Sequence, residues 1–159
     1  MKKSIVVVAT VAAAALLSGC VVSVPPQPGT PKTHAGALPP FQMAPSHEND
    51  VQAIATQAKI LGQQILNQQI TKVQAAQYLN KFRIATVGNN PIDDVAYAAY
   101  LENTVKSQQG RITSEKSKSS IMATLSKLTD QWNASPIKPT DNPAFTNFLL
   151  QTMGMPLLR

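Results

Sequence analysis

Apolar residues recur every three or four positions through most of the chain after residue 48, which is the spacing of one face of a helix. Five such stripes occur, separated by short polar stretches. In chain order the first two comprise Val51, Ile54, Ala55, Ala58, Leu61, Ile65 and Leu66, then Val73, Ala76, Tyr78, Leu79, Phe82 and Ile84. The other three comprise Ile92, Val95, Ala96, Ala99, Tyr100 and Leu101, then Ile121, Met122, Leu125, Leu128 and Trp132, then Phe145, Phe148, Leu149 and Thr152. No segment sustains the alternation of a strand. The pattern therefore predicts an all-α fold, a small four- to five-helix bundle over residues 48–159 with the fifth helix across the others.

Local signals predict where these helices begin and end. Thr71 and Gln74 have the spacing of a capping box, and Asn90 and Asn142 each precede a proline. Glycine is typical of helix ends because it tolerates the left-handed conformation. The remaining predicted boundary residues are Ser46 or Asn49 and Ser114 for helix starts, and Gly88, Gly110 and Gly154 for helix ends.

The start of the chain follows a different pattern. Lys2 and Lys3 precede an apolar run from Ile5 to Leu17, which is shorter than the roughly 20 apolar residues that a membrane-spanning helix needs. The run leads into Leu17-Ser18-Gly19-Cys20, an aliphatic residue, two small residues and a cysteine. Small residues suit this position because a protease must close around the extended backbone before the cleavage point. This arrangement resembles the signal peptide and lipobox of bacterial lipoproteins.

The resemblance implies a covalent lipid as the only group attached to the chain, with no other cofactor. In that family the cysteine sulfur, here that of Cys20, receives a diacylglyceryl group. A signal peptidase that recognises Leu17, Ser18 and Gly19 then removes residues 1–19, and the new amino group can receive a further acyl chain such as palmitate. Two or three chains anchor a protein stably, because each buried methylene contributes about 0.8 kcal/mol. An uncleaved anchor helix from Ile5 to Val24 and an ordinary secretory signal are the alternatives.

The residue after the cysteine bears on the membrane. In enteric bacteria an aspartate there retains a lipoprotein in the inner membrane, whereas this chain has Val21. The resemblance thus implies the outer membrane, facing the periplasm, in an organism with two membranes. Cys20 is the only cysteine, so the sequence predicts no disulfide in the domain.

Residues 20–47 are predicted to form the lipidated cysteine and a linker. Seven prolines fall in this stretch, and proline both removes a backbone donor and disfavours helix in the residue before it. A linker of this length would reach between about 30 Å as a flexible coil and about 80 Å when extended. We expect it to act as a spacer between the membrane and the domain.

Charge and apolar clustering suggest two candidate interaction surfaces. Without Lys2 and Lys3 the formal charge falls from +6 to +4, and it is scattered, so the sequence does not predict a nucleic-acid partner. Basic residues nevertheless bracket the turn between the third and fourth helices, and apolar residues gather at the end of the chain. The candidate surface residues are Lys106, Arg111, Lys116 and Lys118, together with Met155, Leu157 and Leu158.

Residues that could perform chemistry are few. His34 and His47 both fall in the predicted linker, where a catalytic base or a metal ligand cannot be held in place. Asp93 and Asp94 are neighbours on a helix, so their side chains diverge, and first-turn aspartates are expected as partners of the helix dipole. With the single thiol carrying lipid, we expect neither an enzyme nor a metal protein.

The features together favour an envelope interaction protein. Its partners would be the bilayer, through acylated Cys20, and a protein that the helical domain holds or helps to assemble, as pilot lipoproteins of secretion systems do. An inhibitor or immunity protein directed at a toxin or a cell-wall hydrolase is the first alternative. A carrier with a small-ligand cavity between its helices is the second.

Overall fold

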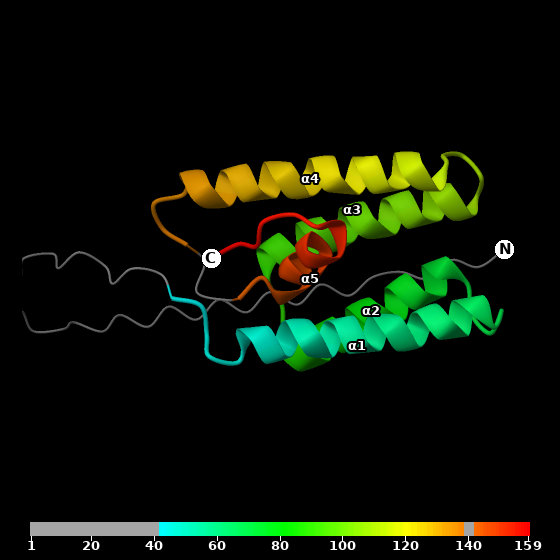
Figure 1. The fold of residues 1–159 in the computed structure, drawn as a ribbon, viewed down its shortest axis with the longest axis horizontal. Helices are drawn as coiled ribbons and strands as arrows, with labels where there is room; N and C mark the ends of the chain where they lie inside the picture. Colours follow the sequence, from blue (N-terminus) through cyan, green and yellow to red (C-terminus); the bar gives the residue numbers. More distant parts are fainter. Residues whose placement is uncertain (1–41, 139–141) are drawn as a thin grey trace, which may run out of the picture. The chain divides into compact units, whose positions relative to one another are not determined.

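The computed structural model describes residues 42–138 and 142–159, and these residues contain five helices and no strand (Figure 1). The helices are α1 (His47–Leu66), α2 (Lys72–Val87), α3 (Pro91–Gln108), α4 (Ser114–Ala134) and α5 (Ala144–Met153). The predicted all-α fold is confirmed. The lipobox, Cys20 and the first part of the predicted linker lie outside the described residues.

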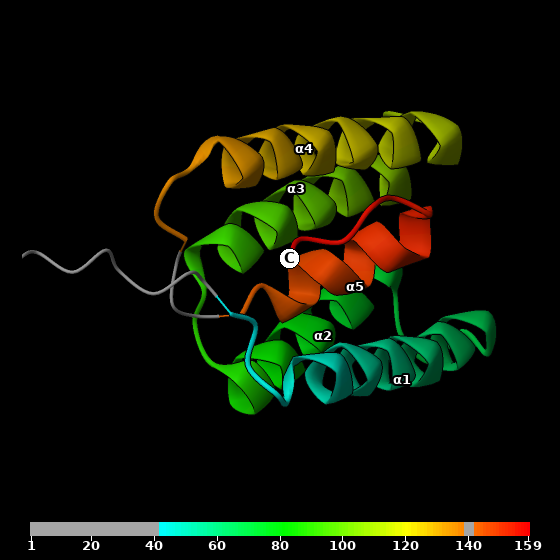
Figure 2. The same ribbon diagram turned by 60° about the vertical axis from the view of Figure 1, so that its left-hand side comes forward.

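The helices form two hairpins with α5 between them. All five belong to one compact unit, in which α1 packs on α2, α2 on α3 and α3 on α4, while α5 contacts α1, α3 and α4. Figures 1 and 2 show the chain running up and down through α1 to α4, with α5 lying between the α1–α2 pair and the α3–α4 pair. The α1–α2 and α3–α4 turns therefore lie at one end of the unit, and residue 42 enters at the other.

Helix α5 forms the centre of the core. Seven consecutive residues, from Ala144 to Leu150, are buried, which is the pattern of a helix enclosed on every side. Phe145 has no exposed surface and meets the rings of Tyr97, Tyr100 and Phe148 at centroid distances of 6.0, 6.2 and 5.9 Å. The predicted crossing of a fifth helix is thus an insertion between the two hairpins.

Most of the predicted helix signals act as expected. Thr71 and Gln74 form both bonds of a capping box, and Asn90 Oδ1 accepts from Ile92 N and Asp93 N at the start of α3. Helix α5 ends at Gly154, which is left-handed with φ 71°. Helix α4 begins at Ser114 as expected, with Thr113 as its N-cap.

Two predicted helix starts lack the expected side-chain cap. Ser46 occupies the N-cap position of α1, as predicted, but its side chain makes no cap bond. Asn142 does not cap α5, because the N-cap position is Pro143 and Asn142 Oδ1 accepts instead from Ala44 N at 2.9 Å. Asparagine is a usual capping residue, but the side chain of Asn142 bonds instead to a residue 98 positions away in the sequence.

Fewer residues of α1 and α3 are buried than the apolar pattern of the sequence predicted. Leu66, the last residue of α1, is 73% exposed, and Val95 of α3 is 50% exposed. The face of α1 that reaches the core is restricted to Val51, Ile54 and Leu61, with its alanines and Ile65 only half-buried. None of the helices within residues 42–138 and 142–159 is both long and apolar enough to cross a bilayer.

Candidate functional site

The chain enters the helical unit beside a hollow of about 440 Å³, here called the entry hollow. Its walls come from residues 42–46, here called the entry segment, and from the first turns of α1, the middle of α5 and the last residues of the chain. They combine apolar side chains with amides and two opposite charges. The lining residues are Met43, His47, Glu48, Val51, Gln52, Asn147, Gln151, Leu157, Leu158 and Arg159.

His47 lines this hollow. The sequence predicted that it belongs to the linker, but it belongs to α1. It is the first residue of α1, it is half-buried, and its Nε2 lies 2.8 Å from Asn147 Nδ2. The linker prediction was wrong here because the proline-rich composition continues up to Pro45, immediately before the helix.

Asn147 determines the protonation of that ring. Its Oδ1 accepts from Leu158 N at 2.8 Å and its Nδ2 donates to Leu158 O at 3.0 Å, which fixes the orientation of the amide. The group facing His47 is therefore an NH₂ donor, so Nε2 must accept and a neutral ring carries its proton on Nδ1. Burial lowers the pKa of His47, opposed in part by the charge of Asp50, which agrees with a neutral ring.

The same amide holds the tail, residues 154–159, against the core. Besides the two bonds from Asn147 to Leu158, Trp132 Nε1 donates to Arg159 O at 2.9 Å. Leu158 is consequently buried and is not part of an exposed apolar surface, whereas Leu157 is 39% exposed at the hollow. Of the apolar residues predicted as an interaction surface, Met155 is half-buried and packs against the core.

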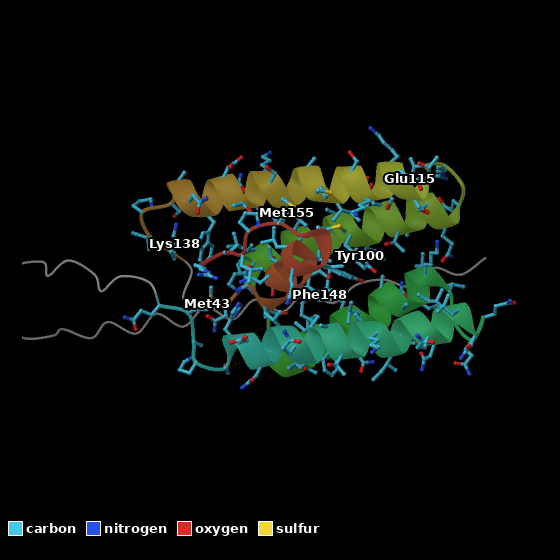
Figure 3. All side chains as sticks on the ribbon, viewed as in Figure 1. Met43, Tyr100, Glu115, Lys138, Phe148 and Met155 are labelled. Atoms are coloured by element: carbon cyan, nitrogen blue, oxygen red, sulfur yellow. The ribbon has the colours of Figure 1, made fainter. Side chains whose placement is uncertain are left out.

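The entry segment is also held in place. Ala44 N donates to Asn142 Oδ1, so the main chain next to Met43 is tied to the residue before Pro143. Figure 3 shows Met43 at the end of the unit where α1 begins, far from Glu115 at the start of α4. The hollow thus joins the incoming chain to α1, α5 and the tail.

A buried polar cluster positions α5, and with it Asn147. Asp93 has no exposed surface and accepts from Phe145 N at 3.0 Å, Thr146 N at 2.8 Å and Thr146 Oγ1 at 2.7 Å. The two main-chain donors belong to the first turn of α5, where the helix itself offers no acceptor and Pro143 supplies no side-chain cap. The sequence assigned Asp93 to its own helix dipole, but its carboxylate caps α5.

Burial and the surrounding hydrogen-bond donors shift the pKa of Asp93 in opposite directions. Burial is the larger effect and raises the pKa of Asp93, while the bonds from Thr146 and Phe145 and the charge of Arg83 lower it. Because the carboxylate has no exposed surface, a substrate cannot reach it. Its role is to hold α5 in place.

Arg83 is the second charged member of this cluster and was not predicted from the sequence. It is 1% exposed, its Nη2 lies 2.6 Å from Asp94 Oδ1, and both Nε and Nη2 donate to Asn80 Oδ1. Its guanidinium also lies 6.0 Å from the ring centroid of Tyr97 and 5.9 Å from that of Phe145. Asp94 therefore pairs across helices while its neighbour Asp93 caps α5.

The predicted basic surface lies elsewhere. Lys106 is paired with Glu102 at 2.5 Å, and Arg111, Lys116 and Lys118 are exposed around the α3–α4 turn. This turn is at the opposite end of the unit from the start of α1 (Figure 1), where residues of the entry hollow lie, so the structure does not bring the basic and apolar candidates together. Tyr97 and Tyr100 are half-buried against Phe145, and burial raises the pKa of both hydroxyls.

A scan against protein-family models, a search of curated proteins and a search of solved structures each found no match. The candidate site therefore rests on its own geometry and chemistry. Within the described part of the chain no group of three or more His, Cys, Asp or Glu residues could hold a metal ion.

Proposed function

We propose that this protein is a lipid-anchored adaptor of the cell envelope. Acylated Cys20 holds the chain at the outer membrane, facing the periplasm, and residues 21–46 join that anchor to the helical unit. The helical unit holds a partner protein, and the entry hollow accepts an apolar side chain of that partner. The sequence of the lipobox supports the anchor, and the chemistry of the entry hollow supports the binding role.

The observation that carries the binding role is the mixed lining of the entry hollow. Met43, Val51 and Leu157 supply apolar walls, while Gln52 and Gln151 bring amides that can donate to and accept from a peptide backbone. A concave, largely apolar surface with a few polar groups is typical of sites that bind ligands or peptide side chains. Glu48 and Arg159 at the same hollow add one charge of each sign.

The carrier alternative is less compatible with the packing between the hairpins. A ligand cavity between helices would have to lie where α5 lies, and the side chains from Ala144 to Leu150 are buried there. The entry hollow, by contrast, lies at the surface of the unit, between the residues before α1, the first turns of α1, α5 and the tail.

A site-specific crosslinking experiment tests the adaptor. A photoreactive amino acid at Gln151 in the full-length lipoprotein should crosslink to one envelope protein in intact cells. Leu157→Arg should abolish that crosslink, because a charged side chain would occupy the apolar wall. Leu66→Arg, at an apolar residue that is 73% exposed and outside the entry hollow, is the matched control and should leave the crosslink unchanged.

Two results would oppose the proposal. One is an absence of any crosslinked protein at Gln151. The other is a crosslink that persists at the same level in Leu157→Arg, because the partner would then bind without using the apolar wall.

A further inference from the structure

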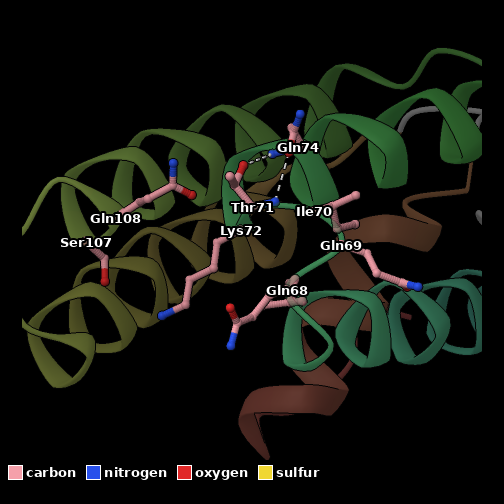
Figure 4. A pocket seen from close by; sticks show the side chains of 9 residues that line it. Gln68, Gln69, Ile70, Thr71, Lys72, Gln74, Ser107 and Gln108 are labelled. Atoms are coloured by element: carbon pink, nitrogen blue, oxygen red, sulfur yellow. Dashed lines mark hydrogen bonds between the residues drawn. The ribbon is translucent and has the colours of Figure 1, made fainter.

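A second hollow, of about 550 Å³, lies beside the α1–α2 turn (Figure 4). This turn is at the end of the unit opposite the start of α1 (Figure 1). We call this second hollow the turn hollow, because the α1–α2 turn forms one side of it and the C-terminal end of α3 the other. It is separated from the entry hollow by most of the length of α1, whose 20 residues span about 30 Å. The lining residues are Ile65, Gln68, Gln69, Ile70, Thr71, Lys72, Gln74, Ser107 and Gln108.

Neutral hydrogen-bonding groups dominate this lining. It contains four glutamines and two hydroxyl residues but one charged side chain, Lys72. Amides and hydroxyls can both donate and accept, whereas carboxylates only accept and ammonium groups only donate. Such a lining matches a ligand rich in hydroxyl and carbonyl groups and poor in charge.

Two of these four amides are held in position by hydrogen bonds. Gln74 Oε1 accepts from Thr71 N at 2.9 Å in the capping box, and Gln108 Oε1 accepts from Val73 N at 3.0 Å. Both bonds use the amide oxygen, and neither Nε2 donates to another described residue. The two side chains therefore keep an oriented NH₂ donor, which lowers the ordering cost of binding.

The backbone of the α1–α2 turn sets the position of Gln68. Gln68 has φ 58°, and it is the only described residue other than glycine with a positive φ. This is the left-handed residue that ends α1, since Gln68 N donates to Ile65 O and Gln69 N donates to Gln64 O, and it places the Gln68 amide at the hollow. In Figure 4 the side chains of Gln68 and Lys72 reach toward the same space.

The charge around the turn hollow indicates a weakly anionic ligand. Lys72 lines it, and exposed Arg111, Lys116 and Lys118 lie at the same end of the unit. A nucleic acid or an anionic lipid surface would call for clustered basic residues within the site itself. One lysine among four glutamines instead suits occasional carboxylates on a largely neutral polymer.

We propose that the turn hollow binds a glycan strand whose sugars carry amide and carboxylate groups. The amides bond to sugar hydroxyls and amide carbonyls, Lys72 pairs with a carboxylate, and Ile65 and Ile70 contact the apolar faces of the sugar rings. This site is separate from the entry hollow, and its binding does not depend on a protein partner or on the lipid anchor.

A binding assay on the full-length protein in detergent tests the proposal. The probes are purified cell-wall sacculi, which consist of glycan strands with short peptides, and soluble oligomers of N-acetylglucosamine. The wild-type protein should sediment with sacculi, and the oligomers should compete. The double variant Gln68→Asn with Lys72→Gln should bind about tenfold more weakly, since it shortens one amide and removes the charge.

Two controls distinguish the site from general effects. Lys59→Gln removes an exposed lysine of α1 outside the turn hollow and should bind as the wild type does. Leu157→Arg disables the entry hollow and should also leave sacculus binding unchanged, so the two proposals can fail separately. Asparagine tolerates the left-handed conformation, and unchanged thermal unfolding of the double variant would show that the fold is intact.

The proposal would be overturned by any of three results. The wild-type protein could fail to sediment with sacculi, or the double variant could bind as tightly as Lys59→Gln. The third result is equal binding to vesicles of phosphatidylglycerol with no competition by the oligomers, which would show that the basic residues at this end bind a lipid surface instead.

Discussion

The Asn147 amide donates to Nε2 of His47 across 2.8 Å while it holds both main-chain groups of Leu158. One side chain of the central helix therefore ties the start of α1 to the tail. A protonated imidazole would bring an N–H against the NH₂ of Asn147, and that amide cannot turn over without breaking its bonds to Leu158. The contact requires a neutral His47.

This requirement predicts a loss of stability in mild acid. Because the pKa of His47 is lowered in the folded state, the unfolded chain takes up a proton first as the pH falls below about 6.5. The free energy of unfolding should then decrease until the pH passes the folded pKa. Urea unfolding at pH 7.5 and 5.5 should show this decrease in the wild type and a smaller one in His47→Asn. His34→Asn is the control and should retain the full decrease.

Removal of the amide itself should release the tail. Asn147→Ala leaves the buried main-chain groups of Leu158 without partners, which should cost about 1–3 kcal/mol of unfolding free energy. Hydrogen exchange at Leu158 should accelerate more than exchange within α3. An unchanged exchange rate at Leu158 would mean that Trp132 and packing hold the tail without Asn147.

For Asp93 we expect stability to depend on pH in the opposite direction from His47. Burial raises its pKa above the ordinary 3.8, so between these two pKa values the folded chain holds the proton more tightly than the unfolded chain. The contribution of this group to stability therefore increases as the pH falls toward 3.8. Titration of Asp93 followed by carboxyl NMR would check the direction, and a folded pKa below 3.8 would contradict it.

The capping role of Asp93 can be tested by substitution. Asp93→Asn presents an NH₂ group to the first-turn donors of α5 and should cost about 1–3 kcal/mol of unfolding free energy, measured by urea titration at pH 7. Asp130→Asn, at an exposed position, is the control and should change the stability by less than about 0.5 kcal/mol. Equal stability of the two variants would show that Asp93 does not hold α5.

The insertion of α5 makes Phe145 a sensitive position. Phe145→Ala would leave a cavity among Tyr97, Tyr100 and Phe148, with an expected cost of about 3–5 kcal/mol. Leu66→Ala removes an apolar side chain that the sequence placed on a buried stripe but that is 73% exposed. Its effect should stay within about 0.5 kcal/mol, measured by the same unfolding titration.

The sequence predicted those features that depend on neighbouring residues. The Thr71–Gln74 capping box and the Asn90–Pro91 helix start each act within three residues, so their patterns identified them correctly. The five helices followed from apolar spacing for the same reason. The class of the fold could be predicted because each helix has its own periodic signal.

The candidate sites could not be predicted from the sequence, because they depend on contacts between residues on different helices. Asp93 meets Thr146 across 53 residues of sequence, and His47 meets Asn147 across 100. Arg83 is buried because Asn80, Asp94 and two aromatic rings surround it, although arginine on a helix is ordinarily expected in solvent. The contacts of Asp93 and His47 follow only from the packing of α5 between the hairpins, and the burial of Arg83 also requires α2 to pack on α3.

Mass spectrometry of the N-terminal peptide from membrane-extracted native protein tests the proposed anchor most directly. We expect a chain that begins at Cys20, with a diacylglyceryl group on the sulfur. A chain that begins at Met1, or a Cys20 with a free thiol, would contradict it.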